Sequence, residues 1–132
     1  MLWMRLDDRM DYKLTFEQKS AYLYAKVTGL NTRENGAAYL HEILIECQSR
    51  RCFRVLIEDR LEGQRLSFMD VFVIVSHGAI EALGIIEACA YVYTNAENRL
   101  MKFAETVAIN RMLHARVFTS VIEAEKWLVS QP

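Results

Sequence analysis

The chain has 132 residues, 52% of them hydrophobic and 25% charged, and its 16 lysines and arginines nearly balance 17 acidic residues for a net charge of −1. A chain of this length buries roughly two thirds of its unfolded surface, enough for a core without disulfides or metal. One proline and five glycines exclude collagen-like and Pro-rich disordered chains. The near-neutral charge provides no basic surface for nucleic acid. We therefore expect one globular domain and no nucleic-acid partner.

The beginning of the chain and its apolar runs predict the compartment. No secretory signal can form at the start, because acidic residues appear as early as Asp7. The longest apolar runs, such as residues 71–75, fall far short of the ~20 residues that a membrane-spanning helix needs. The three cysteines have no C-x-x-C spacing, so we interpret them as small buried side chains. We expect a cytoplasmic protein without a membrane span.

Two strands are expected first. Apolar and polar residues alternate from Tyr12 to Glu17 and again from Tyr22 to Thr28. A short turn near residues 18–20 separates them, so we expect an antiparallel hairpin. The preceding residues 1–11 are expected to form a flexible N-terminal extension.

The first helix is predicted from about Thr32 to about Ser49. Asn31, with Glu34 three residues later, or Thr32 beside it, can cap its first turn. Its expected buried stripe is Ala37, Leu40, Leu44 and Cys47. A short strand over residues 53–58 follows, and residues 59–66 are interpreted as a polar loop.

A second helix is predicted to begin at Ser67, because Asp70 follows at capping distance. Gly78 is expected to end or break it. The continuous apolar run 88–93 indicates an inner strand. Thr94 and Glu97 are expected to cap a third helix, residues 115–118 to form a last strand, and Ser120 to cap a closing helix.

The predicted order is β-β-α-β-α-β-α-β-α, an α/β fold in one domain over residues 12–130. Strands that alternate with helices need crossover connections and therefore a largely parallel sheet. The initial hairpin makes this sheet mixed, with about five strands and about four helices.

Three stretches resemble the STAS superfamily: Val27 to Thr32, in which a strand ends in glycine, Arg54 to Asp59, a strand ending in acid, and Arg116 to Leu128. The resemblance is closest to the SpoIIAA-like branch, which has CRAL-TRIO-like affinity for lipids and consists mostly of uncharacterised bacterial proteins. It spans nearly the whole chain. It implies a sheet of four to five strands with packed helices, and it implies function far less than fold.

The resemblance also implies a switch serine at the start of the second helix in members that antagonise anti-sigma factors. Ser67 has that position and is our candidate phosphosite, since a phosphate at a helix N-terminus gains free N–H groups. The sequence departs from the family pattern, because Phe68 and Met69 follow the serine where those members have a small residue and glycine. An ordinary helix cap is the interpretation that we favour for Ser67.

Open α/β sheets bind ligands at the carboxyl ends of their strands, and polar residues follow several strands here. The candidate residues for binding a partner or ligand are Asn31, Asp59, Arg60, Glu62, Arg65, Ser67, Thr94 and Asn95. The mixed charges of residues 59–65 suit a solvated turn with internal ion pairs equally well, and we favour that interpretation. Gly63 is expected to supply a positive φ.

Tyrosines suggest a second surface. Alternation places Tyr22 and Tyr24 on one side of their strand, and Tyr91 and Tyr93 on one side of theirs. If the helices pack against the intervening residues, these tyrosines share the other face of the sheet. An uncovered aromatic face would serve self-association or an apolar ligand, whereas a helix over it would make the tyrosines part of the core.

No catalytic or metal-binding motif is present, since the three histidines lack H-x-x-x-H spacing and no phosphate-binding glycine motif occurs. We therefore expect no enzyme activity and no cofactor. The favoured function is a binding or regulatory module with a protein partner, possible partner switching and homodimerisation. The alternative is a binder of a lipid or other apolar small molecule.

Overall fold

Two antiparallel strands begin the part of the chain that this computed structural model describes, residues 11–93 and 98–132. β1 (Tyr12–Gln18) pairs with β2 (Leu23–Leu30), with Tyr12 opposite Gly29 and Gln18 opposite Leu23. The predicted hairpin is confirmed. A Cβ atom at Gly29, whose φ is 128°, would lie 2.3 Å from the carbonyl oxygen of Asp11, so this close pairing needs glycine.

The sheet contains five strands in the order β1-β2-β3-β4-β5. β3 (Arg54–Glu62), β4 (Ala88–Tyr93) and β5 (Ala115–Phe118) are parallel to β2 and to one another. The mixed α/β sheet and its element order agree with the sequence prediction. Residues 1–10 of the predicted N-terminal extension lie outside the described residues.

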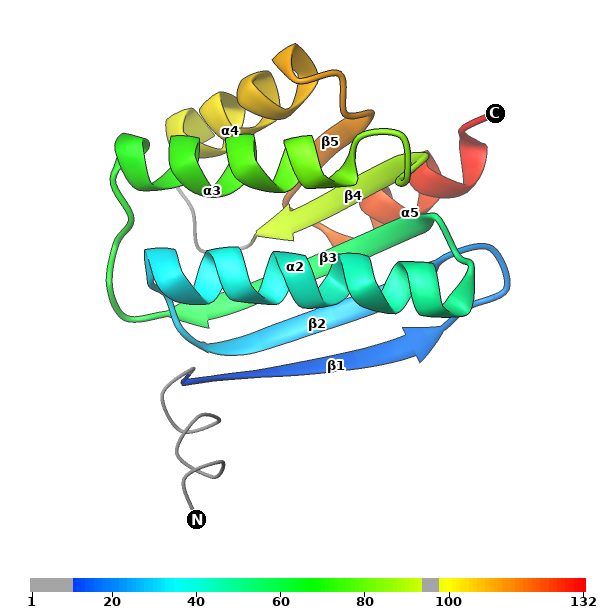
Figure 1. Cartoon of the computed structure of the whole chain (residues 1–132), viewed down its shortest axis with the longest axis horizontal. Coiled ribbons are helices and arrows are strands. Elements are labelled where there is room, and N and C mark those ends of the chain that lie inside the picture. The colour runs from blue at the N-terminus through cyan, green and yellow to red at the C-terminus, as the bar shows by residue number, and fades with distance from the viewer. Residues whose placement is uncertain (1–10, 94–97) are drawn as a thin grey trace.

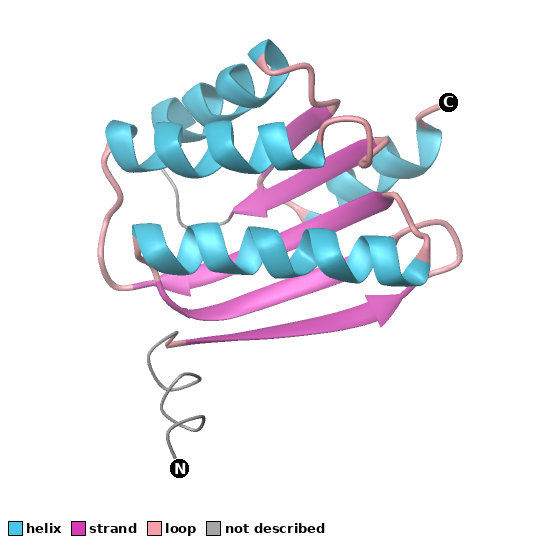
Figure 2. Cartoon of the chain, in the orientation of Figure 1, coloured by secondary structure: helices cyan, strands magenta, loops and turns pink. Residues whose placement is uncertain are grey.

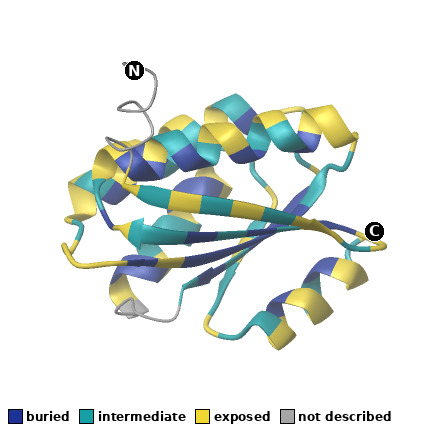
Figure 3. Cartoon of the chain, turned by 90° about the horizontal axis from the view of Figure 1, so that it is seen from below, coloured by how far each residue is buried: buried dark blue, intermediate teal, exposed yellow. Residues whose placement is uncertain are grey.

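Helices cover the two faces of the sheet unequally. α2 (Arg33–Arg50), α3 (Phe68–Ala82) and α4 (Asn98–Asn110) lie on one face, and α5 (Val121–Ser130) lies on the other (Figures 1 and 2). Each face has its own core cluster. One is built around Leu23, Ala25 and Ile57 beneath α2, and the other joins Leu56 and Ala90 of the sheet to Leu128 of α5. The central strands are buried, while residues along β1 alternate between half-buried and exposed (Figure 3).

Two boundary predictions were wrong. β3 continues to Glu62, so the first four residues of the expected polar loop are strand. Residues 59–62 continue the parallel pairing with β2, as far as Glu62 opposite Leu30. The backbone hydrogen bonds of this pairing come from a distant segment, so local composition does not reveal them. α3 runs through Gly78 to Ala82, and Gly78 instead brings α3 close to α2, since a Cβ there would lie 3.2 Å from Leu40 Cδ1.

The cap and buried side of α2 were only partly predicted. Thr32 is the N-cap, and its side chain accepts a hydrogen bond from the backbone N–H of Asn35. The helix buries Tyr39 and Ile43 together with Cys47, whereas Leu40 and Leu44 are half-buried and Ala37 is exposed. The helix is therefore rotated toward Tyr39 relative to the expected stripe.

The other helix caps can be compared with their predictions. Ser67 and Ser120 are N-caps as predicted, and Ser67 forms a reciprocal capping box with Asp70. Thr94 and Glu97, the expected cap of α4, lie outside the described residues.

Candidate functional site

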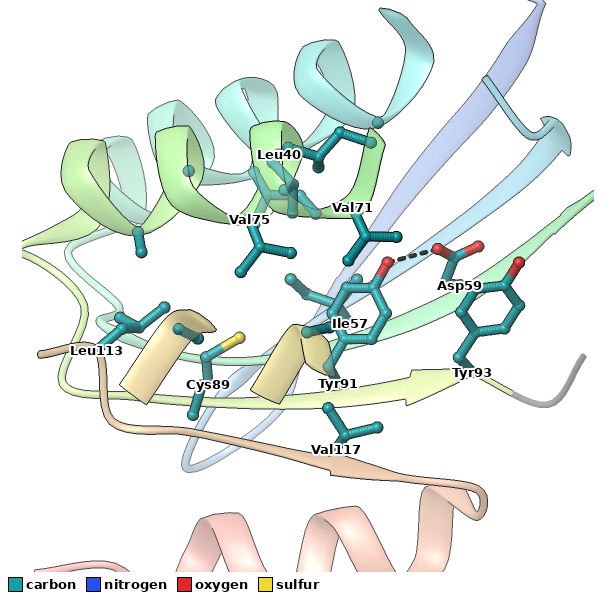
Figure 4. Close-up of a pocket in the computed structure, with 18 of the residues that line it drawn as sticks. Leu40, Ile57, Asp59, Val71, Val75, Cys89, Tyr91, Tyr93, Leu113 and Val117 are labelled. Atoms are coloured by element: carbon teal, nitrogen blue, oxygen red, sulfur yellow. Dashed lines mark hydrogen bonds between the residues drawn. The ribbon is translucent and has the colours of Figure 1, made fainter. Parts of the chain in front are cut away.

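A cavity of about 150 Å³ lies between the sheet and the helices α2, α3 and α4. Its walls come from all three helices and from β3, β4 and β5. Side chains such as Ile57, Val71, Val75, Cys89 and Val117 make most of the lining apolar (Figure 4). Small residues of the two helices, Gly36 of α2 and Gly78, Ala79 and Ala82 of α3, are among the lining residues.

One end of the cavity is polar and is centred on Asp59 of β3, which is only 3% exposed. The Tyr39 hydroxyl from α2 donates to Asp59 Oδ2 at 2.9 Å, and the Tyr91 hydroxyl from β4 donates to the same oxygen. The two hydroxyls also contact each other. The backbone N–H of Leu61 donates to Asp59 Oδ1 at 2.9 Å. Three elements therefore bring their polar atoms to one point.

Asn31 and Tyr93 extend this polar end. Asn31 directly follows β2 and is 5% exposed. Its Nδ2 donates to the Tyr93 hydroxyl at 3.2 Å and to the carbonyl oxygen of Gln64 at 2.9 Å. Tyr93 ends β4 and stands beside Asp59 at the cavity wall (Figure 4). The amide therefore ties the end of β2 to the end of β4.

Burial dominates the electrostatics of these groups. It raises the pKa of Asp59 above its usual value, and the hydrogen bonds from Tyr91, Leu61 and Tyr39 only partly oppose this rise. The pKa values of Tyr39 and Tyr91 lie well above 10, first because of burial and then because of the nearby Asp59 charge. The same two causes raise the pKa of Tyr93. Every titratable group at this end is therefore shifted toward its neutral, protonated form.

The charged residues of the cavity lining have one sign: they are Asp59, Glu81 and Glu105, and no lysine, arginine or histidine is among the described lining residues. Glu81 lies 3.4 Å from His41 Nδ1 and 3.8 Å from His77 Nε2. Glu105 Oε2 accepts a hydrogen bond from the backbone N–H of Val117 at 2.9 Å. Asp59 takes part in none of the ion pairs formed by residues 11–93 and 98–132.

Among the predicted partner- or ligand-binding residues that the structure describes, Asn31 and Asp59 are the two that line the cavity. The interpretation of Asp59 as part of a solvated turn was wrong, because its carboxyl group is buried inside the sheet-helix interface. The side chain of Arg60 lies on the face of β3 opposite to Asp59, because successive strand residues point to opposite faces. There its Nε lies 2.5 Å from Glu58 Oε2. The prediction of internal ion pairing therefore holds for Arg60 and not for Asp59.

Of the remaining predicted residues, those that the structure describes do not line the cavity. Glu62 and Arg65 are exposed, and Gly63 between them has the expected positive φ of 98°. Ser67 is exposed and caps α3. Thr94 and Asn95 lie outside the described residues.

The expectation of a shared tyrosine face was wrong. The strand register places Tyr24 level with Leu56 and Ala90, and places Tyr91 level with Ile57 and Ala25. Tyr22 and Tyr24 therefore lie on the α5 face, where Tyr22 is buried, whereas Tyr91 and Tyr93 lie under α2, α3 and α4. Parallel pairing sets this register, and it cannot be read from alternation within single strands.

Sequence reasoning missed Tyr39 altogether and assigned Tyr91 to a surface. A usable signal existed, since Tyr39 lies one helical turn before Ile43 and two before Cys47, all buried on one side of α2. The parallel topology then brings the end of β3 beside that helix. A tyrosine on a buried helix face needs a polar partner, and Asp59 is that partner.

Comparison with solved structures shows the fold. The crystal structure of an uncharacterized protein from the DUF3478 family of Shewanella loihica PV-4, described as having a SpoIIAA-like fold, matches with a TM-score of 0.51 and 15% sequence identity. The match covers 89% of this chain and 93% of that chain. The fold is SpoIIAA-like. At this identity the SpoIIAA-like likeness concerns fold alone, and neither the family models nor the curated proteins contain a match to the sequence.

The described residues contain neither a membrane-spanning helix nor a cluster of metal ligands. No helix among them is long and apolar enough to cross a membrane. Within the same residues, no group of three or more histidine, cysteine, aspartate or glutamate side chains is placed to hold a metal ion.

Proposed function

We propose that this chain is a non-enzymatic binding protein for a small apolar molecule, held in the cavity beneath α2, α3 and α4. The sequence favoured a protein-binding module and retained an apolar ligand as the alternative. The cavity is the observation that changes this order of preference. Its polar end would orient one polar group of the ligand, as a few convergent polar groups do in apolar pockets.

The size of the cavity supports a ligand of few atoms. Its volume of about 150 Å³ is comparable with that of an engineered apolar cavity that stays dry and binds benzene. The lining side chains of an empty cavity lose dispersion contacts on one side, so an apolar guest restores contacts that the protein alone does not make. Because water finds few hydrogen-bond partners in a mostly apolar space, the cavity favours an apolar ligand.

Toluene binding tests this function. We expect isothermal titration calorimetry and the amide spectra of labelled protein to show saturable binding, with the largest shifts at residues of α2, α3 and β4. Replacing Val75, which faces the cavity, by phenylalanine should fill the space and abolish binding (Figure 4). The matched control is Val129→Phe, on α5 at the other face of the sheet and 50% exposed.

The outcomes separate clearly. Saturable binding that Val75→Phe removes and Val129→Phe retains supports the proposed function. Absence of binding to wild-type protein, or equal binding to both variants, rejects it.

A second candidate function, protein binding, is favoured by a separate observation. Several apolar side chains on α3 are exposed, among them Met69 at 62% and Ile80 at 59%. Exposed apolar side chains on one helix suit a partner or a second copy of the chain. A dimer in native mass spectrometry that Ile80→Lys converts to monomer would support this function, and a wild-type monomer would remove self-association from it.

A further inference from the structure

The buried carboxyl group of Asp59 has no cationic partner among the described residues. A buried carboxylate without a countercharge is costly, so it is either protonated or paired. Its neighbour Glu58, equally buried on the other face, is paired with Arg60. The same strand thus carries one acid that has a cation and one that lacks it.

We infer that the ligand of the cavity is a small apolar amine whose ammonium group binds at Asp59. This inference rests on the proposed function and adds a class of ligand to it. All charged residues of the described lining are acidic, so the field inside the cavity favours a positive group. Tyr39, Tyr91 and Tyr93 surround the carboxyl group with aromatic rings and hydroxyl oxygens, both of which attract an ammonium ion.

The carboxylate has room for one more donor. Its two oxygens can accept about four hydrogen bonds when ionised. Tyr39 and Tyr91 donate to Oδ2, and Leu61 donates to Oδ1, so the described residues supply three donors. Because Asp59 lines the cavity, one N–H of an ammonium group in the cavity can donate the fourth hydrogen bond, to Asp59 Oδ1.

Amine binding is coupled to the protonation state of Asp59. Burial raises the pKa of Asp59 and so favours its neutral, protonated form before a ligand binds. When an ammonium ion binds, the Asp59 proton leaves to solvent and the carboxylate forms an ion pair with the ligand. The site is neutral in both states, so no net charge is buried.

This exchange predicts the pH dependence of binding. Amine affinity should rise with pH as Asp59 loses its proton more easily, and should level off above its pKa. The groups that face Asp59 are Tyr39 from α2, Tyr91 and Tyr93 from β4, and the amide of Asn31. Glu81 and Glu105 line the cavity from α3 and α4, and His41 and His77 lie beside Glu81. A double variant, His41→Gln and His77→Gln, is the control for the two side chains beside Glu81.

The experiment compares benzylamine, benzyl alcohol and toluene by calorimetry over a range of pH, in buffers of different ionisation enthalpy. We expect benzylamine to bind about tenfold or more tightly than benzyl alcohol, because a hydrogen bond to a charged group is stronger than a neutral one. We also expect release of one proton per amine bound below the pKa of Asp59, and none with toluene.

Two variants locate the effect. Asp59→Asn should remove the preference for the amine and the proton release while toluene still binds. Glu58→Gln, one residue away on the opposite face, should leave both unchanged. If Asp59→Asn does not fold, the wild-type ratio of amine to alcohol affinity and the proton release still decide. Toluene binding without a preference for the amine overturns this inference and leaves the proposed function standing, whereas no binding of any probe overturns both.

Discussion

Glu58 and Asp59 are adjacent in β3 and are only 4% and 3% exposed, yet their carboxyl groups lie on opposite faces of the sheet. Each accepts a hydrogen bond from a tyrosine of a neighbouring strand, Tyr24 for Glu58 and Tyr91 for Asp59. Only Glu58 also has an arginine. The pKa of Glu58 is therefore lowered from its usual value, whereas the pKa of Asp59 is raised.

Glu58 should stabilise the fold at neutral pH. Burial alone would raise its pKa, but the Tyr24 hydroxyl and the Arg60 guanidinium outweigh burial and hold the pKa below its usual value. The unfolded chain then binds the proton more tightly, so this stability is complete above about pH 4.3 and is lost as pH falls through the folded pKa. We expect Glu58→Gln to lower the free energy of unfolding at pH 7 by about 1 kcal/mol. Urea titrations from pH 3 to 7 should show a smaller loss in acid for the variant; parallel curves would contradict the assignment.

Asp59 should contribute most to the stability of the fold in acid and less as the pH rises. Burial raises its pKa, so the folded state holds the proton more tightly than the unfolded state. Its contribution is complete below about pH 3.9 and falls as pH rises through the folded pKa. The stability of wild type relative to Asp59→Asn should therefore decline from pH 4 upward. A relative stability that grows with pH would show instead that the carboxylate is ionised and favourably bound.

Gly36 and Gly78 lie in the facing helices α2 and α3, and alanine should affect them differently. A Cβ at Gly36 would lie 2.8 Å from Ile74 Cδ1 and within 3.4 Å of its Cγ1 and Cγ2, so we expect Gly36→Ala to cost about 1–3 kcal/mol. At Gly78 the nearest atom is the tip of Leu40, which borders the cavity and can move into it. Gly78→Ala should gain about 0.5–1 kcal/mol from helix propensity. Thermal unfolding of both variants tests the contrast, and a destabilised Gly78→Ala would show that Leu40 is fixed.

Ser67 should act first as a helix cap. Its Oγ accepts from the backbone N–H of Asp70, and its own N–H donates to Asp70 Oδ2, both at 3.0 Å. We expect Ser67→Ala to destabilise the protein by about 1 kcal/mol, and Ser67→Asp to retain most of the stability because aspartate also caps helices. Ser130→Ala, near the end of α5, is the exposed control. Equal stability of Ser67→Ala and wild type would remove the capping role.

The three cysteines should differ in reactivity. Burial, with smaller contributions from neighbouring charges, raises the pKa values of Cys47 and Cys89 to about 12, so neither forms thiolate at neutral pH. Cys52 is half-buried. In the native protein a thiol reagent should therefore modify Cys52 first, and the other two thiols should react only after unfolding. Rapid modification of Cys89 in native protein would show that reagents enter the cavity that it lines.

Much of the fold could be predicted from local signals. The last strand was placed at Ala115–Phe118, and the serine caps at Ser67 and Ser120 were found, because alternation and capping involve residues close in sequence. The end of β3 was missed because its ladder partner is β2, some thirty residues earlier. Gly78 was misread because its role is the contact with Leu40 on another helix.

The candidate site was predictable only in part. The rule that ligands bind beyond the carboxyl ends of parallel strands selected Asn31 and Asp59, which both line the cavity. It also selected Arg60, whose side chain lies on the face of β3 opposite to Asp59 and pairs with Glu58. Tyr39 escaped notice because the expected stripe of α2 was centred one residue away from the side that packs on the sheet.

The sequence by itself determined the element order, the mixed sheet and the serine caps of α3 and α5, because these depend on periodicity and on hydrogen bonds between near neighbours. Only the tertiary structure decided that Glu58 and Asp59 face different cores and that Tyr39 and Tyr91 meet at Asp59. It also decided that a cavity remains between the sheet and the helices α2, α3 and α4. Strand register and helix rotation fix these relationships, and both arise from packing between segments far apart in the chain.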